Sequence, residues 1–326
     1  MTSRHIPASF FGMVLGLSGL GQAWRIAAHL WSLPAPIGEG LLLLAGLVWA
    51  ILLSSYVLQT FRRFESVKAE FLHPVQGSTP ALLGVSTLLI VLAIRPYSTT
   101  AAWILTGAGI SWHLVFSLWH TGTLWQGGRD TLDTAPTLYL PTVAGNFTSA
   151  AALGALGHAD WGWLFLGAGV FSWLALESLI IQRLWHPKTM PVAQRPLLGI
   201  QFAPPVVCAM ACLMLMPGST APWLLMLWGY GLFQLLLVVL LDRLDPLDWL
   251  QRQGLPVPAA LQWAAQHALS LTVLMLLVYY GYVALIAFDK EFLAQPLNST
   301  GVTTLGIPIA LFVIVFTVAI TLFYIR

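Results

Sequence analysis

Long apolar runs alternate with short polar segments along the whole of this 326-residue chain. A helix needs about 20 mostly apolar residues to cross a hydrocarbon layer about 30 Å thick. By that criterion the pattern predicts ten spans, at 8–32, 39–61, 79–95, 98–124, 141–157, 161–182, 197–216, 222–241, 258–287 and 303–325. Backbone groups in lipid must find their hydrogen bonds within the segment, so each span should be an α-helix. We therefore expect an all-α polytopic membrane protein with a single transmembrane domain, residues 1–326.

The charged residues support this interpretation and indicate an orientation. Only 8% of the residues are charged, against about 25% in soluble domains, so the chain could not cover its own surface in water. Eleven of the fourteen Lys and Arg residues fall on one side of the predicted spans, and Arg25, Arg95 and Lys290 fall on the other. Because positively charged loops stay in the cytoplasm, both termini are expected there. The net charge of +2 is too small to indicate a nucleic-acid partner.

The odd-numbered spans share a local pattern. Each begins with a proline followed by small or polar residues, and these prolines are Pro7, Pro80, Pro141, Pro196 and Pro258. Proline suits a first helical turn, where its missing N–H would be unpaired anyway, so the pattern is either five ordinary helix starts or a structural repeat. Small residues favour helix contacts and cavities, whereas the Leu and Trp of several even spans favour lipid. We expect five hairpins, with the odd helices as an inner pore ring and the even helices as an outer ring.

Small and neutral polar residues inside the odd spans are the candidates for a solute pathway. We interpret the following as pore-lining: Gly84, Thr87, Asn146, Ser149, Gln201, Gln262, Gln266 and Ser270. Taken singly, each is explained as well by packing or by hydrogen bonds between helices. Taken together, with no Lys or Arg at mid-membrane depth, they predict a narrow and weakly polar pathway rather than a ring of charges.

Two charged residues need an explanation of their own. Glu177 is an intramembrane acid, and because a carboxylate in lipid costs about 2.5–3.5 kcal/mol it should face protein or water. It is either a hydrogen-bonded structural acid near the cytoplasmic interface or the proton-linked group of a coupled carrier. Arg25, near the external face, either snorkels to the headgroups or attracts anions to the outer mouth.

The sequence indicates neither a cofactor nor a metal. His113 and His120 lie seven residues apart on one face of a span, but a bis-histidine haem would need facing helices. Cys208 and Cys212, four apart in an apolar run, have the pattern of small buried hydrophobic residues. The chain has no Gly-rich phosphate loop, zinc signature or nucleophile elbow. We therefore expect no cofactor and no enzyme active site.

Several segments resemble one known family. They are Pro7-Ala-Ser-Phe-Phe-Gly-Met-Val-Leu-Gly16, Gly21-Gln-Ala-Trp-Arg25, His73-Pro74-Val75, Leu138-Tyr-Leu-Pro-Thr-Val-Ala-Gly-Asn-Phe147, Phe165-Leu-Gly-Ala-Gly-Val-Phe-Ser-Trp-Leu174 with Glu177, Leu198-Gly-Ile-Gln-Phe-Ala-Pro204 and Gly229-Tyr-Gly-Leu-Phe-Gln234. In this order they are similar to the bacterial TehA family of tellurite-resistance or C4-dicarboxylate transporters, which is related to the slow anion channels of plant guard cells. The resemblance implies ten helices in five hairpins around a pore, three subunits with one pore each, and small anions as the solute.

The resemblance also implies a gate, and at this point the chain departs from the family. The family closes its pore with a phenylalanine on the ninth helix, inside a Trp-x-aromatic-x-Phe pattern. Here the matching segment is Trp263-Ala-Ala-Gln-His267, which places His267 at the gate position. An imidazole changes charge near pH 6.5. We therefore predict that acidification increases anion passage through His267.

Three functions remain open from the sequence. The first is a TehA-like anion channel or facilitator in a bacterial inner membrane, linked to tellurite resistance. The second is a proton-coupled carrier of C4-dicarboxylates or oxyanions, with Glu177 or His267 carrying the proton. The third, from another class, is an intramembrane enzyme, which would need titratable groups that converge at one depth. We favour the first, with small inorganic or organic anions and the lipid bilayer as partners and a homotrimer as the assembly.

Overall fold

The computed structural model describes residues 6–188, 190–217 and 221–241, and all structural statements below concern these residues. They form nine α-helices and no strand. The helices are α1 (Gly12–Trp31), α2 (Ala35–Arg62), α3 (Phe64–Phe71), α4 (Ala81–Ile94), α5 (Thr99–Trp125), α6 (Gly145–Ala155), α7 (Ala159–Leu184), α8 (Ala203–Leu215) and α9 (Pro222–Leu241). The predicted spans at 258–287 and 303–325 lie outside the described residues.

All of these helices except α3 match one of the first eight predicted spans. The odd-numbered spans correspond to α1, α4, α6 and α8, and these helices begin irregularly. Short 3-10 turns lead into α1 (Ala8–Phe11) and α4 (Gln76–Ser78). A π-helical segment, Leu140–Ala144, leads into α6 and includes Pro141 in its first turn. We call these short segments the leads of the helices that follow. Pro7 directly precedes the lead of α1, Pro80 directly precedes α4, and Pro141 lies within the lead of α6. The expected prolines are therefore present at these helix starts, and the leads have non-α geometry.

Two features differ from the expected spans. The amphipathic helix α3 was not predicted, because its eight residues are too short and too charged to register as a span. The predicted span 197–216 is divided into a 3-10 helix, Val192–Ile200, and α8. Pro204 and Pro205 occupy the first turn of α8, where a missing N–H does no harm.

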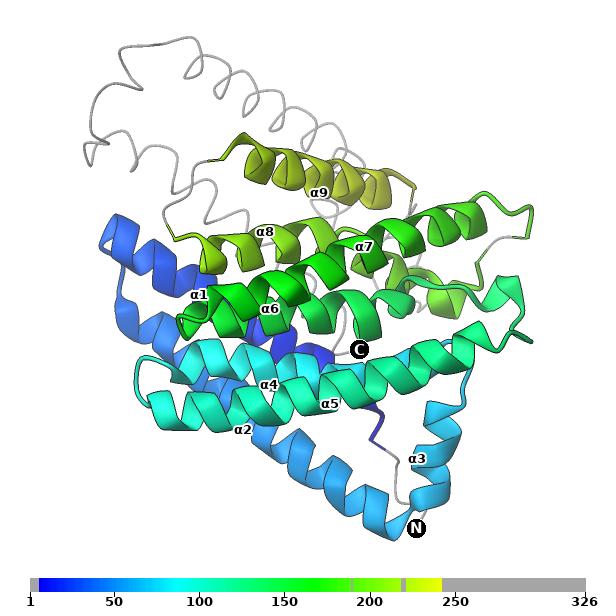
Figure 1. The fold of residues 1–326 in the computed structure, drawn as a ribbon, viewed down its shortest axis with the longest axis horizontal. Coiled ribbons are helices and arrows are strands. Elements are labelled where there is room, and N and C mark those ends of the chain that lie inside the picture. Colours follow the sequence, from blue (N-terminus) through cyan, green and yellow to red (C-terminus); the bar gives the residue numbers. More distant parts are fainter. Residues whose placement is uncertain (1–5, 189, 218–220, 242–326) are drawn as a thin grey trace, which may run out of the picture. The chain divides into compact units, whose positions relative to one another are not determined.

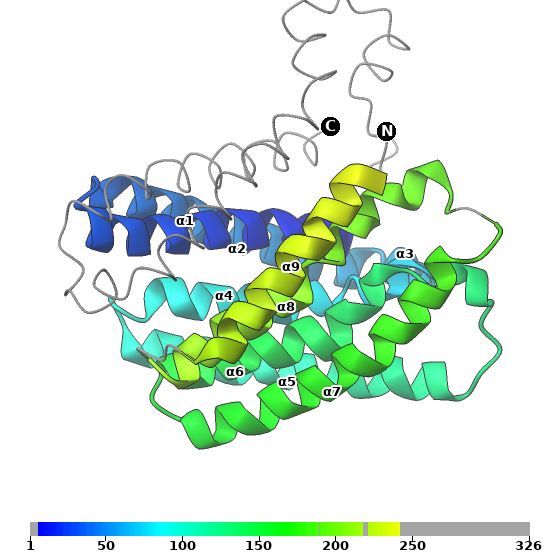
Figure 2. The ribbon, with the colours of Figure 1, turned by 90° about the horizontal axis from the view of Figure 1, so that it is seen from above.

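Consecutive helices pack as antiparallel hairpins. The most extensive contacts in the described part of the chain join α1 with α2, α4 with α5, and α6 with α7, and the last two pairs lie side by side in Figure 1. The first helix of each hairpin also contacts the first helix of the next, so that α1, α4, α6 and α8 form a continuous row. Figure 2 shows the same helices turned by 90°.

Burial separates this row of inner helices from the outer ones. Within the most apolar window of each candidate span, 83% of the residues of Gln76–Ile94 are buried, against 22% in α2, 33% in α5 and 28% in α7. Every residue of α6 from Gly145 to Leu153 is buried. The outer helices instead expose large apolar side chains, such as Leu43 of α2 and Phe171 of α7. An exposed apolar surface of this kind is what lipid covers, so α4 and α6 are inside and α2, α5 and α7 face outward.

Candidate functional site

The described pore-lining candidates on α6 contact their neighbours through hydrogen bonds. The Asn146 amide donates to Thr142 O at 2.5 Å, and its Oδ1 lies 3.1 Å from His113 Nε2 on α5. Ser149 is fully buried and donates to Gly145 O at 2.7 Å. His113 therefore belongs to a contact between an inner and an outer helix, and Asn146 fixes the orientation of its ring.

The candidates on α4 make close contacts with two outer helices. Thr87 accepts a hydrogen bond from Trp49 Nε1 of α2 at 3.0 Å and donates to Leu83 O at 2.7 Å. Gly84 faces α5, where an added Cβ would lie 3.1 Å from Gly109 O. The backbones of α4 and α5 approach closely at this point because neither residue has a side chain.

A buried carboxylate organises the last of the described candidates. Glu177 of α7 is 9% exposed and accepts five hydrogen bonds. The donors are Tyr139 Oη at 2.5 Å and Trp173 Nε1 at 2.9 Å to Oε2, and Gln201 Nε2 at 3.0 Å, Tyr230 Oη at 2.8 Å and Gln234 Nε2 at 2.6 Å to Oε1. The structure thus brings Gln201 and Glu177 together. No sequence pattern indicated this cluster, although every donor lies in or beside a segment that carried the family resemblance.

A second buried carboxylate was missed entirely. Glu70 of α3 is 6% exposed and accepts from Ala8 N at 2.6 Å and from Tyr56 Oη at 3.0 Å. Thr79 Oγ1 lies 3.5 Å from the same carboxylate. Glu70 lies outside the predicted spans, in a loop expected to face water, so its burial depends on packing of the short helix α3 that hydropathy does not reveal.

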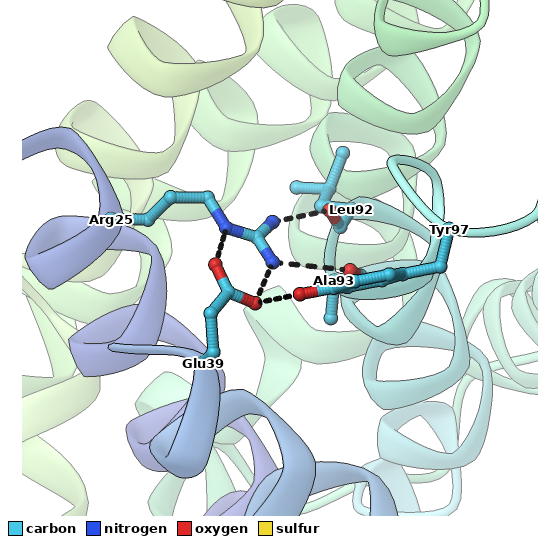
Figure 3. A network of polar contacts seen from close by, with 5 residues as sticks. All are labelled: Arg25, Glu39, Leu92, Ala93 and Tyr97. Carbon is cyan, nitrogen blue, oxygen red and sulfur yellow. Dashed lines mark hydrogen bonds and ion pairs between the residues drawn. The ribbon is translucent and has the colours of Figure 1, made fainter. Parts of the chain in front are cut away.

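Near the C-terminal end of α1, Arg25 is tied to two neighbouring helices (Figure 3). Its Nε and Nη2 donate to the two oxygens of Glu39 at 2.7 and 2.6 Å, and its Nη1 and Nη2 reach Leu92 O and Ala93 O at the end of α4. Tyr97 donates to Glu39 Oε2 at 2.5 Å, and that hydrogen bond raises the pKa of the phenol above its ordinary value. Two explanations for Arg25 were open from the sequence, snorkelling to the headgroups or attracting anions. The structure shows a third, because Glu39 neutralises its charge.

This pair gives a prediction about stability. A double-mutant cycle with Arg25→Gln and Glu39→Gln should show a favourable coupling of about 1 kcal/mol, the upper part of the range for partly exposed pairs, because the contact is bidentate. The side chains are 24% and 34% exposed, so salt should weaken the coupling. Thermal unfolding in detergent at low and high salt measures it. A coupling of zero at low salt would contradict this role for the pair.

Buried donors on the inner row include three polar groups that have no hydrogen-bond partner among the described residues. They are Ser18 Oγ and Gln22 Nε2, one turn apart on α1, and Thr142 Oγ1 in the lead of α6. Ser18 is fully buried. A buried hydroxyl or amide donor without an acceptor is costly, which makes these groups candidates for hydrogen bonds to a solute. The remaining candidates, Gln262, Gln266, Ser270 and the gate His267, lie outside the described residues.

These observations define a class of protein: a helical membrane protein whose inner helices carry neutral hydrogen-bonding groups and whose described intramembrane charges are held in fixed contacts. The profile of the voltage-dependent anion channel family, SLAC1, matches residues 5–325. The chain belongs to this family, which makes it a membrane protein of anion transport and confirms the predicted resemblance.

Individual relatives agree with the family match. The chain is 35% identical over 253 residues to the tellurite resistance protein TehA homolog of Haemophilus influenzae, covering 77% of this chain and 75% of that protein. It is 27% identical over 218 residues to the S-type anion channel SLAH3 of Arabidopsis thaliana, covering 63% of this chain and 33% of that much longer protein. A shorter match, 45% identical over 60 residues, covers 18% of this chain and 58% of the inner membrane protein YjcH of Escherichia coli.

Proposed function

We propose that the chain is a channel or facilitator that lets small anions cross a bacterial inner membrane down their gradient. The observation that carries the proposal is the continuous row of helices α1, α4, α6 and α8, in which α4 and α6 are screened from the lipid by outer helices that expose Leu, Phe and Trp. One further hairpin, from the predicted spans 258–287 and 303–325, would complete the ring, giving ten helices around one pathway. The homotrimer and the cytoplasmic termini are part of the same proposal, supported by the family resemblance and by the charge asymmetry of the loops.

Neutral donors would select the anions. Ser18, Gln22 and Thr142 offer hydrogen atoms that no described acceptor takes, and Asn146, Ser149, Gly84, Thr87, Gln201, Gln262, Gln266 and Ser270 remain candidates for the wall of the pathway. Weak dipoles replace only part of a hydration shell, so anions that lose water easily should pass best. The weakness of binding also lets the anion leave, which conduction requires.

The hydrogen bonds of Glu177 favour a channel over a proton-coupled carrier. Both oxygens accept from donors on other residues, and each donor is itself held by packing. A shuttling acid needs access to water on both sides in turn, and the described surroundings of Glu177 are protein side chains.

Reconstitution in liposomes tests the proposal. Purified protein should accelerate the efflux of a panel of anions, with nitrate and iodide faster than chloride, and chloride faster than sulfate, while protein-free vesicles stay closed. Efflux of C4-dicarboxylates that requires an imposed proton gradient would support the coupled carrier instead. The absence of any anion flux from correctly folded protein would refute both.

The proposed gate makes a separate prediction about pH. If His267 occupies the pore, lowering the pH through about 6.5 adds a positive charge there, so anion currents should rise several-fold as the imidazole is protonated. His267→Ala should give currents that are larger at neutral pH and no longer respond to acid. Currents recorded between about pH 5.5 and 7.5 measure this. The same acid response in His267→Ala would remove His267 from the mechanism.

A further inference from the structure

The two buried carboxylates of the described chain, Glu70 on α3 and Glu177 on α7, make similar contacts. Glu70 and Glu177 each accept hydrogen bonds from residues that lead into inner helices and from a tyrosine of an outer helix. We infer that Glu70 and Glu177 are positioning residues for anion passage, clamps that fix the starts of the inner helices against the outer ones. The inference rests on the proposed function and assigns a role to residues that do not touch the anion.

The Glu177 clamp holds two inner helices at once. Tyr139 directly precedes the π-helical lead of α6, and Gln201 stands between the 3-10 helix Val192–Ile200 and α8. Both donate to the Glu177 carboxylate, and Gln201 Nε2 also donates to Tyr139 Oη at 3.1 Å. The outer helix α9 contributes Tyr230 and Gln234 to the same carboxylate. One side chain of α7 therefore connects the leads of α6 and α8 to two outer helices.

The Glu70 clamp does the same for α1. Ala8 is the first residue of the 3-10 lead of α1, and its N–H donates to Glu70 Oε1 at 2.6 Å. The outer helix α2 contributes Tyr56, which donates to Oε2 at 3.0 Å. Thr79, two residues before α4, is the more distant contact at 3.5 Å, and its hydroxyl lies closer to Gln76 O, at 2.7 Å. The clamp is therefore firm for α1 and weaker for α4.

These helix starts need an external support. The first N–H groups of a helix have no partner within the helix, and a 3-10 or π-helical lead does not continue the regular α ladder. Such a segment can shift relative to the helix that follows. A carboxylate that accepts an orphan N–H, as Glu70 does from Ala8, both satisfies the group and fixes its position. The clamps would thus set the spacing between the inner helices on the side where those helices begin.

Glutamate-to-aspartate variants separate position from charge. Glu70→Asp and Glu177→Asp keep the carboxylate but withdraw it by one methylene, so it can no longer reach all of its donors. Tyr139→Phe is a milder variant, which removes the hydrogen bond from the lead of α6 to Glu177, together with one acceptor of Gln201 Nε2, and leaves the carboxylate and its other four donors in place. Glu65→Asp is the matched control, because Glu65 is an exposed acid on the same short helix as Glu70.

The readout is the unitary current and the nitrate-to-chloride permeability ratio in planar bilayers, neither of which depends on protein abundance. We expect the three clamp variants to change one or both by about fivefold, the lower end of a typical coupling between distant sites, and Glu65→Asp to match the wild type. If either aspartate variant fails to fold, Tyr139→Phe still decides the question. Clamp variants with wild-type unitary currents and permeability ratios, altered only in abundance, would overturn the inference. A wild-type protein without anion current would instead refute the proposed function.

Discussion

Replacing Glu177 with alanine should destabilise the protein by about 3–5 kcal/mol, as expected when one member of a buried polar network is removed and the others stay buried. Five donors would lose their acceptor, and four of them belong to other segments: Tyr139, Gln201, Tyr230 and Gln234. The contacts between α6, α7, α8 and α9 should loosen together.

Thermal unfolding in detergent, with the yield of folded protein, measures this effect. Glu65→Ala, which removes an exposed acid, is the control and should change stability by less than about 0.5 kcal/mol. The loss of stability in Glu177→Gln should lie between those of the two alanine variants. The amide keeps one acceptor oxygen, but in place of the second oxygen it has an NH2 group that faces other donors. A Glu177→Ala protein as stable as the Glu65→Ala protein would show that the network contributes little.

Replacing Gly145 with alanine should cost about 1–3 kcal/mol or more, because a Cβ at this position overlaps the imidazole of His113. The added atom would lie 2.5 Å from His113 Cε1 and closer still to Nδ1. His113 is only 3% exposed, and its ring is held by the hydrogen bond to Asn146. The imidazole therefore has no room to retreat, and α5 and α6 would have to separate.

A matched glycine provides the control for this prediction. Gly107, on α5, has no atom within 4 Å of the position that a Cβ would take. Gly107→Ala should be neutral or stabilising by up to about 1 kcal/mol, because alanine is the better helix former. His113→Ala makes room for the new methyl group, so the double variant with Gly145→Ala should lose less stability than the two single variants together. Strict additivity would contradict the steric explanation.

Hydropathy was sufficient to locate the eight described membrane helices, because each of them is a long run of residues that are apolar enough for contact with lipid. The ends of the predicted spans lie within a few residues of the ends of α2, α5 and α7. Hydropathy could not reveal α3, which is short and amphipathic, nor the π-helical turn before α6, which depends on how Pro141 packs rather than on its polarity. The inner and outer assignment followed from side-chain size, since small residues let helices approach and large apolar ones meet lipid.

Partners of individual polar residues could not be predicted in the same way. Glu39 lies at the edge of a predicted span, yet nothing in its surroundings along the chain indicated that Arg25, fourteen residues earlier, would bind both of its oxygens. Glu70 was treated as a loop residue. Asn146 and Thr87 were predicted to line the pore, and their hydrogen bonds to His113 and from Trp49 could not be foreseen because they depend on the rotation of neighbouring helices. Such contacts arise from tertiary packing and leave no periodic signal.

The central claim is that anions pass along the inner helices without a coupled proton, and a current measurement tests it most directly. With purified protein in a planar bilayer and unequal concentrations of one anion on the two sides, the account predicts a current that reverses at the equilibrium potential of that anion. Imposing a pH difference across the same bilayer should leave this reversal potential unchanged. A reversal potential that shifts with the pH difference would contradict the account and identify a proton-coupled carrier.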